Sequence, residues 1–153
     1  MKIPIKHAIE SGNWFQCVSG WDFQHKEHSF RFRVLSFNRV NLEDVDHPED
    51  ISLNTDGGSL WIMKLQLINL NKTEEGVTHG LIHIVDNDGY NFPTFEDIHI
   101  RFDSNYAKVS GLRDLFGKSY IPKIKYTGAL VYLLPDEETE YFVSVPGGNI
   151  KEI

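Results

Sequence analysis

The sequence predicts an all-β protein of about seven to nine antiparallel strands with one short helix, arranged as a two-sheet sandwich or a barrel, of which we favour the sandwich. Short apolar runs recur along the chain, separated by Gly, Asn, Asp and Pro. Aromatic residues make up 12% of the chain, and they favour the pleated, half-buried surface of a sheet. The length of 153 residues fits one domain with a sizeable core. We therefore interpret residues 1–153 as a single sandwich domain.

Two long segments give the strongest strand patterns. In residues 27–40, Phe30, Phe32 and Val34 alternate with two arginines, which indicates a strand with one buried and one solvated face. Residues 59–70 are apolar on one face throughout and on the other face in part. That second pattern predicts a central strand of the sandwich.

The remaining elements follow from turn residues and shorter apolar runs. Asp86 to Gly89 predicts a hairpin with a type I turn and a glycine bulge. Pro135 to Glu138 is interpreted as a hairpin loop between the last two strong strands, and the chain after Gly148 as a short tail. Ser110 as a cap and Gly117 as a terminator predict the short helix over 110–117. The other predicted strands are 14–18, 21–23, 80–86, 98–102, 126–134 and 139–145.

A set of ordered features links the second half of the chain to a known family. They are Leu65, Leu67 and Asn69, then Asp88-Gly89-Tyr90, Leu112, Pro122, the run Gly128-Ala129-Leu130-Val131-Tyr132 with Pro135, and Tyr141. From Trp61 to Val145 the chain resembles bacterial immunoglobulin-like domains of unknown function, which occur in secreted antigens and lipoproteins. The resemblance implies a sandwich whose Gly-then-apolar strand packs into the core, and it implies no catalytic residues. The sequence shows neither the leader nor the lipobox cysteine of this family, from which we expect a departure from its extracellular role if Met1 is the native start.

Charge and hydropathy narrow the range of partners. The formal net charge is −7, which disfavours nucleic acid because phosphate backbones repel an acidic surface. No apolar run is long enough for a membrane span, and the first residues lack the core of a signal peptide. We expect a cytoplasmic protein if Met1 is the native start, and otherwise a secreted one. The single cysteine, Cys17, is expected to be a small buried hydrophobe.

An acidic segment, residues 41–58, is the most unusual feature of the sequence and is interpreted as a loop inserted between two strands. It contains no Lys or Arg, and its candidate partner-binding residues are Glu43, Asp44, Asp46, Glu49 and Asp50. One interpretation is a functional surface, either a docking surface for a basic protein partner, whose approach the charges would steer, or a cation site. The other is a solvated face without a role, which is the commoner meaning of a charge run.

Two further features offer weaker candidate sites. Trp14 and Trp21 would form an aromatic platform for a sugar or peptide if they were exposed, but packing in the core or at a sheet edge is the favoured explanation of such residues. Asp86 and Asp88 are weak candidates for a calcium site. We favour a plain turn there, because the further oxygen ligands that calcium requires are missing at EF-hand spacing.

No catalytic motif is present in the sequence. There is no nucleophile elbow, no phosphate-binding glycine loop and no activated Cys–His pair, and no cofactor is indicated. An enzyme would require residues such as His83, Asp97 and His99 to converge in one pocket. We therefore expect a non-enzymatic protein-interaction module. The alternative is a binding domain for carbohydrate or calcium, and an exposed sheet edge would also permit pairing with a second copy.

Overall fold

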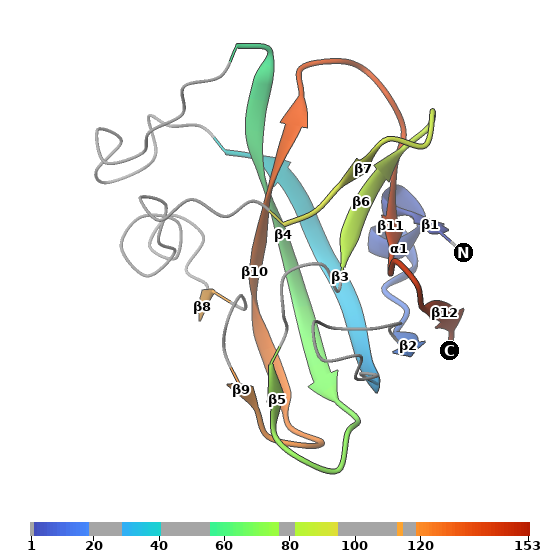
Figure 1. The fold of residues 1–153 in the computed structure, drawn as a ribbon, viewed down its shortest axis with the longest axis vertical. Coiled ribbons are helices and arrows are strands. Elements are labelled where there is room, and N and C mark those ends of the chain that lie inside the picture. The colour runs from blue at the N-terminus through green and yellow to red at the C-terminus, as the bar shows by residue number, and fades with distance from the viewer. Residues whose placement is uncertain (1, 19–28, 41–55, 77–81, 95–112, 115–118) are drawn as a thin grey trace.

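The computed structural model describes residues 2–18, 29–40, 56–76, 82–94, 113–114 and 119–153, and in them the chain forms an all-β sandwich with one short helix (Figure 1). The helix is α1 (Ile5–Ser11). The strands are β1 (Lys2–Pro4), β2 (Phe15–Val18), β3 (Ser29–Arg39), β4 (Gly58–Asn69), β5 (Glu75–Gly76), β6 (His83–Asp86), β7 (Asn91–Phe92), β8 (Arg113–Asp114), β9 (Ser119–Tyr120), β10 (Lys125–Pro135), β11 (Tyr141–Ser144) and β12 (Asn149–Glu152). Eight of these strands contain three or more residues, within the predicted range.

The larger sheet has the order β12-β2-β3-β4-β10-β8, and its three long strands, β3, β4 and β10, lie side by side. β4 pairs antiparallel with β3 on one side and with β10 on the other. The predicted central strand is therefore confirmed. Its core-facing residues Met63, Leu65 and Leu67 are all buried.

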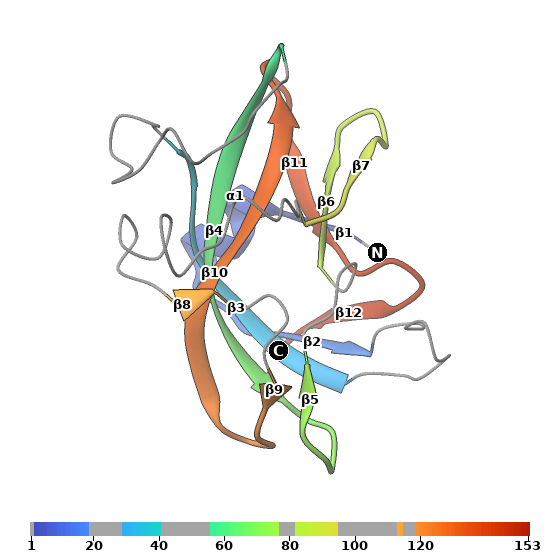
Figure 2. The same cartoon turned by 60° about the vertical axis from the view of Figure 1, so that its left-hand side comes forward.

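The second layer is a four-stranded sheet of order β1-β11-β6-β7. Figure 2 shows it lying against the long strands of the larger sheet. The core lies between the two layers, because one cluster of buried side chains draws on both: Ile3, Ile84 and Val143 from the smaller sheet, and Phe32 and Tyr132 from the larger. β5 and β9 pair as a separate two-stranded sheet, and Tyr120 of β9 is buried in the same core.

The predicted hairpin at Asp86 is present and joins β6 to β7. The Gly89 amide donates to the Asp86 carbonyl at 3.2 Å, and the Asp86 amide donates to the Tyr90 carbonyl at 3.0 Å. Gly89 adopts a φ of 88°, which a side chain would strain. These bonds match a turn closed by a glycine bulge.

The link from Pro135 to Glu138 is not a hairpin, contrary to our interpretation. β10 belongs to the larger sheet and β11 to the smaller one, so the segment crosses between the layers. Asp136 explains the change of direction. Its amide donates to the Gly57 carbonyl at 2.7 Å, and its carboxylate accepts a hydrogen bond from Ser59, so the chain is held against the start of β4 rather than folding back along β10.

The helix and the C-terminal segment also differ from prediction. Residues 113–114, inside the predicted helix, form β8, which pairs parallel with β10; the rest of 110–117 lies outside the described residues. The helix is instead α1, where Ile5 and Ala8 are buried and Ile9 packs on the core. This spacing of three and four residues was its signal. The expected tail is β12, which pairs with β2. The predicted strands at 21–23 and 98–102 fall outside the described residues.

Candidate functional site

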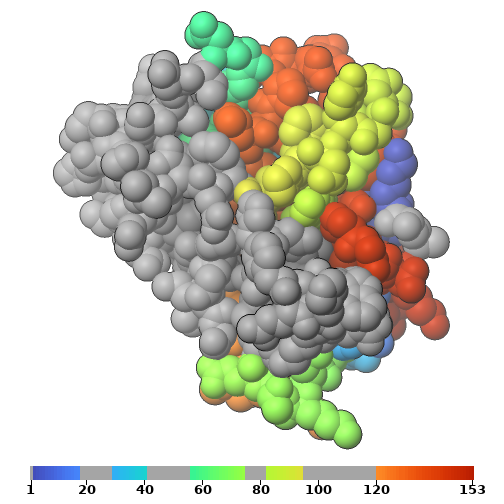
Figure 3. Space-filling view, in the orientation of Figure 1, coloured from blue at the N-terminus to red at the C-terminus, as the bar shows by residue number. Residues whose placement is uncertain are grey.

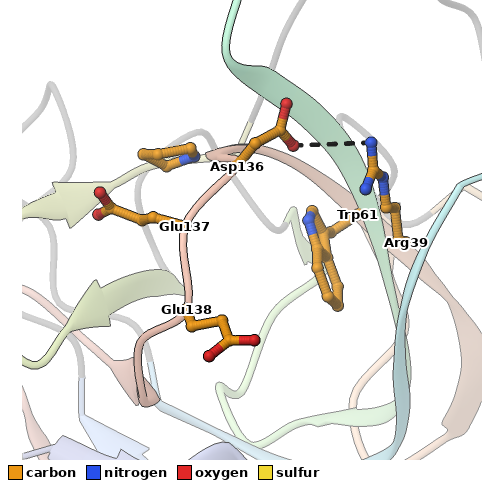
Figure 4. A pocket seen from close by; sticks show the side chains of 6 residues that line it. Arg39, Trp61, Asp136, Glu137 and Glu138 are labelled. Carbon is orange, nitrogen blue, oxygen red and sulfur yellow. Dashed lines mark ion pairs between the residues drawn. The ribbon is translucent and has the colours of Figure 1, made fainter.

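An open pocket lies at the end of the sandwich where β3 ends, β4 begins and the chain leaves β10. It has a volume of about 290 Å³. Arg39, Trp61 and the segment Pro135 to Glu138 line it. Figure 4 shows Trp61 and Arg39 on one side of the pocket, and Asp136, Glu137 and Glu138 opposite them.

Strand register brings the pocket residues together. Arg39 of β3 is paired with Trp61 of β4, and Trp61 is paired with Tyr132 of β10, so one row crosses three strands. A β-bulge between Val34 and Ser36 sets this row. The extra residue exchanges inward and outward positions along β3, which turns Phe37 and Arg39 toward the side that Phe32 and Val34 occupy earlier in the strand.

Trp61 is held by a cluster of aromatic side chains. Its ring stacks on Phe37, with centroids 5.0 Å apart and planes at 20°. Phe37 in turn contacts Tyr132 at 6.3 Å and Tyr141 at 6.4 Å in edge geometry. Phe37 covers one face of the indole, and the Trp61 side chain is only half-buried. A rigid aromatic surface is thus presented at the pocket.

Asp136 is the fixed anionic group of the site. Its Oδ1 accepts the Ser59 hydroxyl at 2.5 Å and lies 3.7 Å from an Arg39 guanidinium nitrogen. The Ser59 bond is short and the Ser59 side chain is buried, whereas the ion pair is long and exposed. Ser59 therefore positions the carboxylate, and the exposed ion pair contributes little stability.

Glu137 and Glu138 supply the uncommitted charge. Both side chains are exposed, and neither carboxylate forms a hydrogen bond or ion pair with another described residue. Three carboxylates (Asp136, Glu137, Glu138) and one guanidinium (Arg39) line the pocket, so its formal charge is −2. Acidic side chains at an open pocket favour a cationic ligand group.

The negative charges near the pocket also affect the Tyr141 hydroxyl. It is shielded from solvent and has no hydrogen-bond partner among the described residues. Burial raises the pKa of Tyr141, and the negative charges of Glu137, Asp86 and Asp136 raise that pKa further. The carboxylates at this end of the molecule therefore act together on the groups around them.

The residues of the predicted acidic docking surface, Glu43, Asp44, Asp46, Glu49 and Asp50, lie outside the described residues. The residues on either side of positions 41–55 are described. The Val40 amide donates to the Leu60 carbonyl at 2.8 Å on one side, and the Gly57 carbonyl accepts from Asp136 on the other. These flanking residues therefore lie beside the pocket.

The predicted aromatic platform is only partly described. Trp14 is half-buried, and the Arg33 guanidinium lies 5.4 Å from its ring centroid, so a cation from the chain itself already occupies one face. Trp21 lies outside the described residues. Of the predicted platform, the structure therefore describes Trp14 alone.

The predicted calcium candidates have a role in the turn. Asp86 is buried, and its Oδ1 accepts the amides of Asp88 at 2.9 Å and of Tyr90 at 2.8 Å. Asp88 is exposed. Within the described segments, no group of three or more His, Cys, Asp or Glu side chains is arranged to hold a metal ion.

Only one of the three candidate enzyme residues lies in the described part of the chain. His83 is half-buried on β6, and its Nδ1 lies 2.6 Å from the Asn91 amide nitrogen. Asp97 and His99 fall outside the described residues. Cys17 is fully buried in the core, as expected, and burial raises the pKa of its thiol to about 12.

Sequence reasoning missed the pocket itself. Trp61 lies on the core-facing side of β4, but its place at the end of the sheet leaves it only partly buried. The acidic run Asp136-Glu137-Glu138 was visible and was read as a turn. These carboxylates lie opposite Trp61 because the chain after Pro135 crosses from one sheet to the other. This crossing is a tertiary feature that no local sequence pattern shows.

No protein-family model and no curated protein matches this chain. A conserved hypothetical protein from Bacillus anthracis has a similar structure, with a TM-score of 0.52, 14% identity, and coverage of 91% of this chain and 96% of that one. The likeness shows a shared β-rich fold. The immunoglobulin-like type of that fold stays a prediction.

Two further solved structures are less similar. The secreted protein MPT63 from Mycobacterium tuberculosis has a TM-score of 0.44 at 9% identity, covering 85% of this chain and 92% of that one. A functionally unknown protein from Listeria monocytogenes has a TM-score of 0.37 at 14% identity, covering 88% and 72%. No helix among the described residues is long and apolar enough to cross a membrane.

Proposed function

We propose that this protein is a non-enzymatic interaction module of immunoglobulin-like type that binds a partner protein through a cationic side chain. This proposal rests on the pocket, in which the half-buried Trp61 ring lies opposite the three carboxylates of Asp136, Glu137 and Glu138 (Figure 4). A lysine or arginine of the partner would enter this pocket.

The chemistry of the pocket suits such a side chain. A cation over the free face of an indole is attracted by the ring quadrupole, and the attraction is strongest when water is excluded. Phe37 occupies the other face of Trp61, so the ring does not have to be ordered on binding. Glu137 and Glu138, which have no partner among the described residues, would pair with the incoming charge.

The acidic segment 41–58 supports the same partner class. The described residues that flank it, Val40 and Gly57, lie beside the pocket, and its sequence carries the acidic residues Glu43, Asp44, Asp46, Glu49 and Asp50. Charges around a binding site mainly raise the association rate, and salt screens them. We expect binding to weaken as ionic strength rises.

A binding assay with charge variants tests the proposal. Isothermal titration with short oligolysine and oligoarginine peptides should give saturable, salt-sensitive binding to the wild type. The double variant Glu137→Gln/Glu138→Gln and the variant Trp61→Leu should each lose about tenfold or more in affinity, as expected for removed charge pairs or cation–π contacts.

The matched control is Glu140→Gln, an exposed acidic residue outside the pocket lining. It should bind like the wild type. Equal binding by the pocket variants and the control would reject the pocket as the binding site, and so would stronger binding of oligoglutamate than of oligolysine.

A second candidate is a carbohydrate site at the same place. Arg39 and Asp136 bring groups of opposite charge to one side of Trp61, and such pairs can bind hydroxyl groups beside an aromatic face. A neutral oligosaccharide that binds without salt dependence, and that Trp61→Leu abolishes, would favour this candidate.

A further inference from the structure

The end of the sandwich opposite the pocket presents an apolar tip. The turn from Ile121 to Ile124, between β9 and β10, carries two large hydrophobic side chains that are 55% and 49% exposed. Among the described residues only Tyr90 and Ile153 are comparably exposed large hydrophobics, and each stands alone. The turn and the neighbouring loop after β4 form the lower end of the molecule in Figures 1 and 3.

This turn is held in place rather than loose. The Ile121 amide donates to the Tyr126 hydroxyl at 3.2 Å, and the Lys123 amide donates to the Asn69 carbonyl at 2.9 Å. Lys123 has a φ of 65°, a left-handed conformation that costs energy in a residue with a side chain. Such strain persists only where the surrounding structure enforces it, and it is concentrated at functional positions.

A buried amide provides that enforcement. The Asn69 Nδ2 donates to the carbonyls of Tyr120 at 2.8 Å and Thr73 at 3.0 Å, and its Oδ1 accepts from the Asn71 amide at 2.8 Å. One side chain thus ties the turn before β10 to the loop after β4. The two loops form a single rigid surface.

The charges around the two isoleucines are mainly positive. Lys72, Lys123 and Lys125 are exposed here, and Glu74 is the one acidic side chain that the described part of these two loops exposes. The acidic pocket lies at the far end of β10, ten strand residues away, or about 30 Å. That separation exceeds the Debye length at physiological salt, which is about 8 Å, so the pocket does not cancel the tip's charge.

We propose that this tip, Ile121 to Ile124 with Lys72 and Lys125, docks on an anionic membrane surface. The isoleucines would enter the boundary between headgroups and acyl chains, and the lysines would pair with lipid phosphates. The rigid backbone of the turn limits the entropy lost on insertion. Docking in this way would direct the acidic pocket away from the membrane.

Co-sedimentation with vesicles tests the proposal. The wild-type protein should sediment with vesicles that mix phosphatidylcholine and phosphatidylglycerol at low ionic strength, and less with vesicles of phosphatidylcholine alone. Ile121→Ser/Ile124→Ser should lower the partition into anionic vesicles about tenfold or more, because each buried isoleucine contributes apolar transfer energy. Lys123→Gly keeps the left-handed backbone and removes one charge, so it should weaken binding less.

The control Tyr90→Ser removes an exposed hydrophobic side chain at another place and should bind vesicles like the wild type. Glu137→Gln/Glu138→Gln should also keep vesicle binding while losing oligolysine, which separates this proposal from the proposed function. Failure of the wild type to sediment with anionic vesicles would overturn the proposal, as would equal binding by Ile121→Ser/Ile124→Ser or sedimentation of the protein without vesicles.

Discussion

At single positions, burial decides how a side chain behaves, whatever its residue type suggests. Cys17 lies in the core cluster with Phe15 and Phe30 as its neighbours in the strands. A thiol there behaves as an apolar side chain because its thiolate has no solvation. Trp61 is the opposite case, since its core-facing position becomes partly exposed at the end of a sheet.

We predict that Cys17 does not react with a thiol reagent in the native protein at neutral pH. Desolvation raises the pKa of the thiol to about 12, and the side chain is fully buried. The thiol should react fully once the chain is unfolded in urea. A colorimetric thiol assay in both conditions checks this, and stoichiometric reaction in native buffer would contradict it.

At the scale of elements, the sequence predicted the strands better than their connections. Alternation in β3 and the apolar faces of β4 reflect local burial, so both strands could be recognised. The link after Pro135 was misread because its direction depends on Asp136 binding to Gly57 and Ser59, which are distant in sequence. The bulge between Val34 and Ser36, which turns Arg39 into the pocket row, was missed for a related reason. No local residue announces it.

Asn69 joins several elements, and its loss should be costly. We expect Asn69→Ala to lower the free energy of unfolding by about 3 kcal/mol, because it removes the hydrogen bonds that the buried Asn69 side chain makes with Tyr120, Thr73 and Asn71. Urea unfolding measures the change. Asn38→Ala, at an exposed position of β3, is the control and should change stability by less than about 0.5 kcal/mol. Similar values for both variants would refute the role of Asn69.

At the scale of the whole molecule, side-chain hydrogen bonds link the N-terminal and C-terminal segments of the chain. Glu152 of β12 accepts hydrogen bonds from Asn13 at 2.7 Å and lies 2.9 Å from His7 of α1. The hydrogen bonds from Asn13 and His7 lower the pKa of Glu152 below its usual 4.5; desolvation opposes this shift, and the charge of His7 adds to it.

This shift predicts how stability depends on pH. A carboxyl group whose pKa is lower in the folded state stabilises the fold above about pH 4.5, and that contribution is lost as pH falls through the folded pKa. The urea midpoint of Glu152→Gln should therefore fall less than that of the wild type on acidification. Parallel pH profiles for the two proteins would contradict the prediction.

The whole molecule also has opposite chemistry at its two ends. An acidic aromatic pocket lies at one end of β10, and a basic apolar tip lies at the other. Composition alone showed only the net charge of −7. The separation along the molecule depends on the register of β10 with β4, which places Lys125 beside Ile68 and Pro135 beside Gly58.

The most direct test of the account is where a cationic peptide binds. In an NMR titration of the protein with oligolysine, the indole N–H signal of Trp61, assigned through Trp61→Leu, should shift together with the backbone amides of Glu137 and Glu138. Signals of the opposite tip, Ile121 to Ile124, should stay in place. Shifts confined to other surfaces, or no shifts at saturating peptide, would contradict the claim that this pocket is the recognition site.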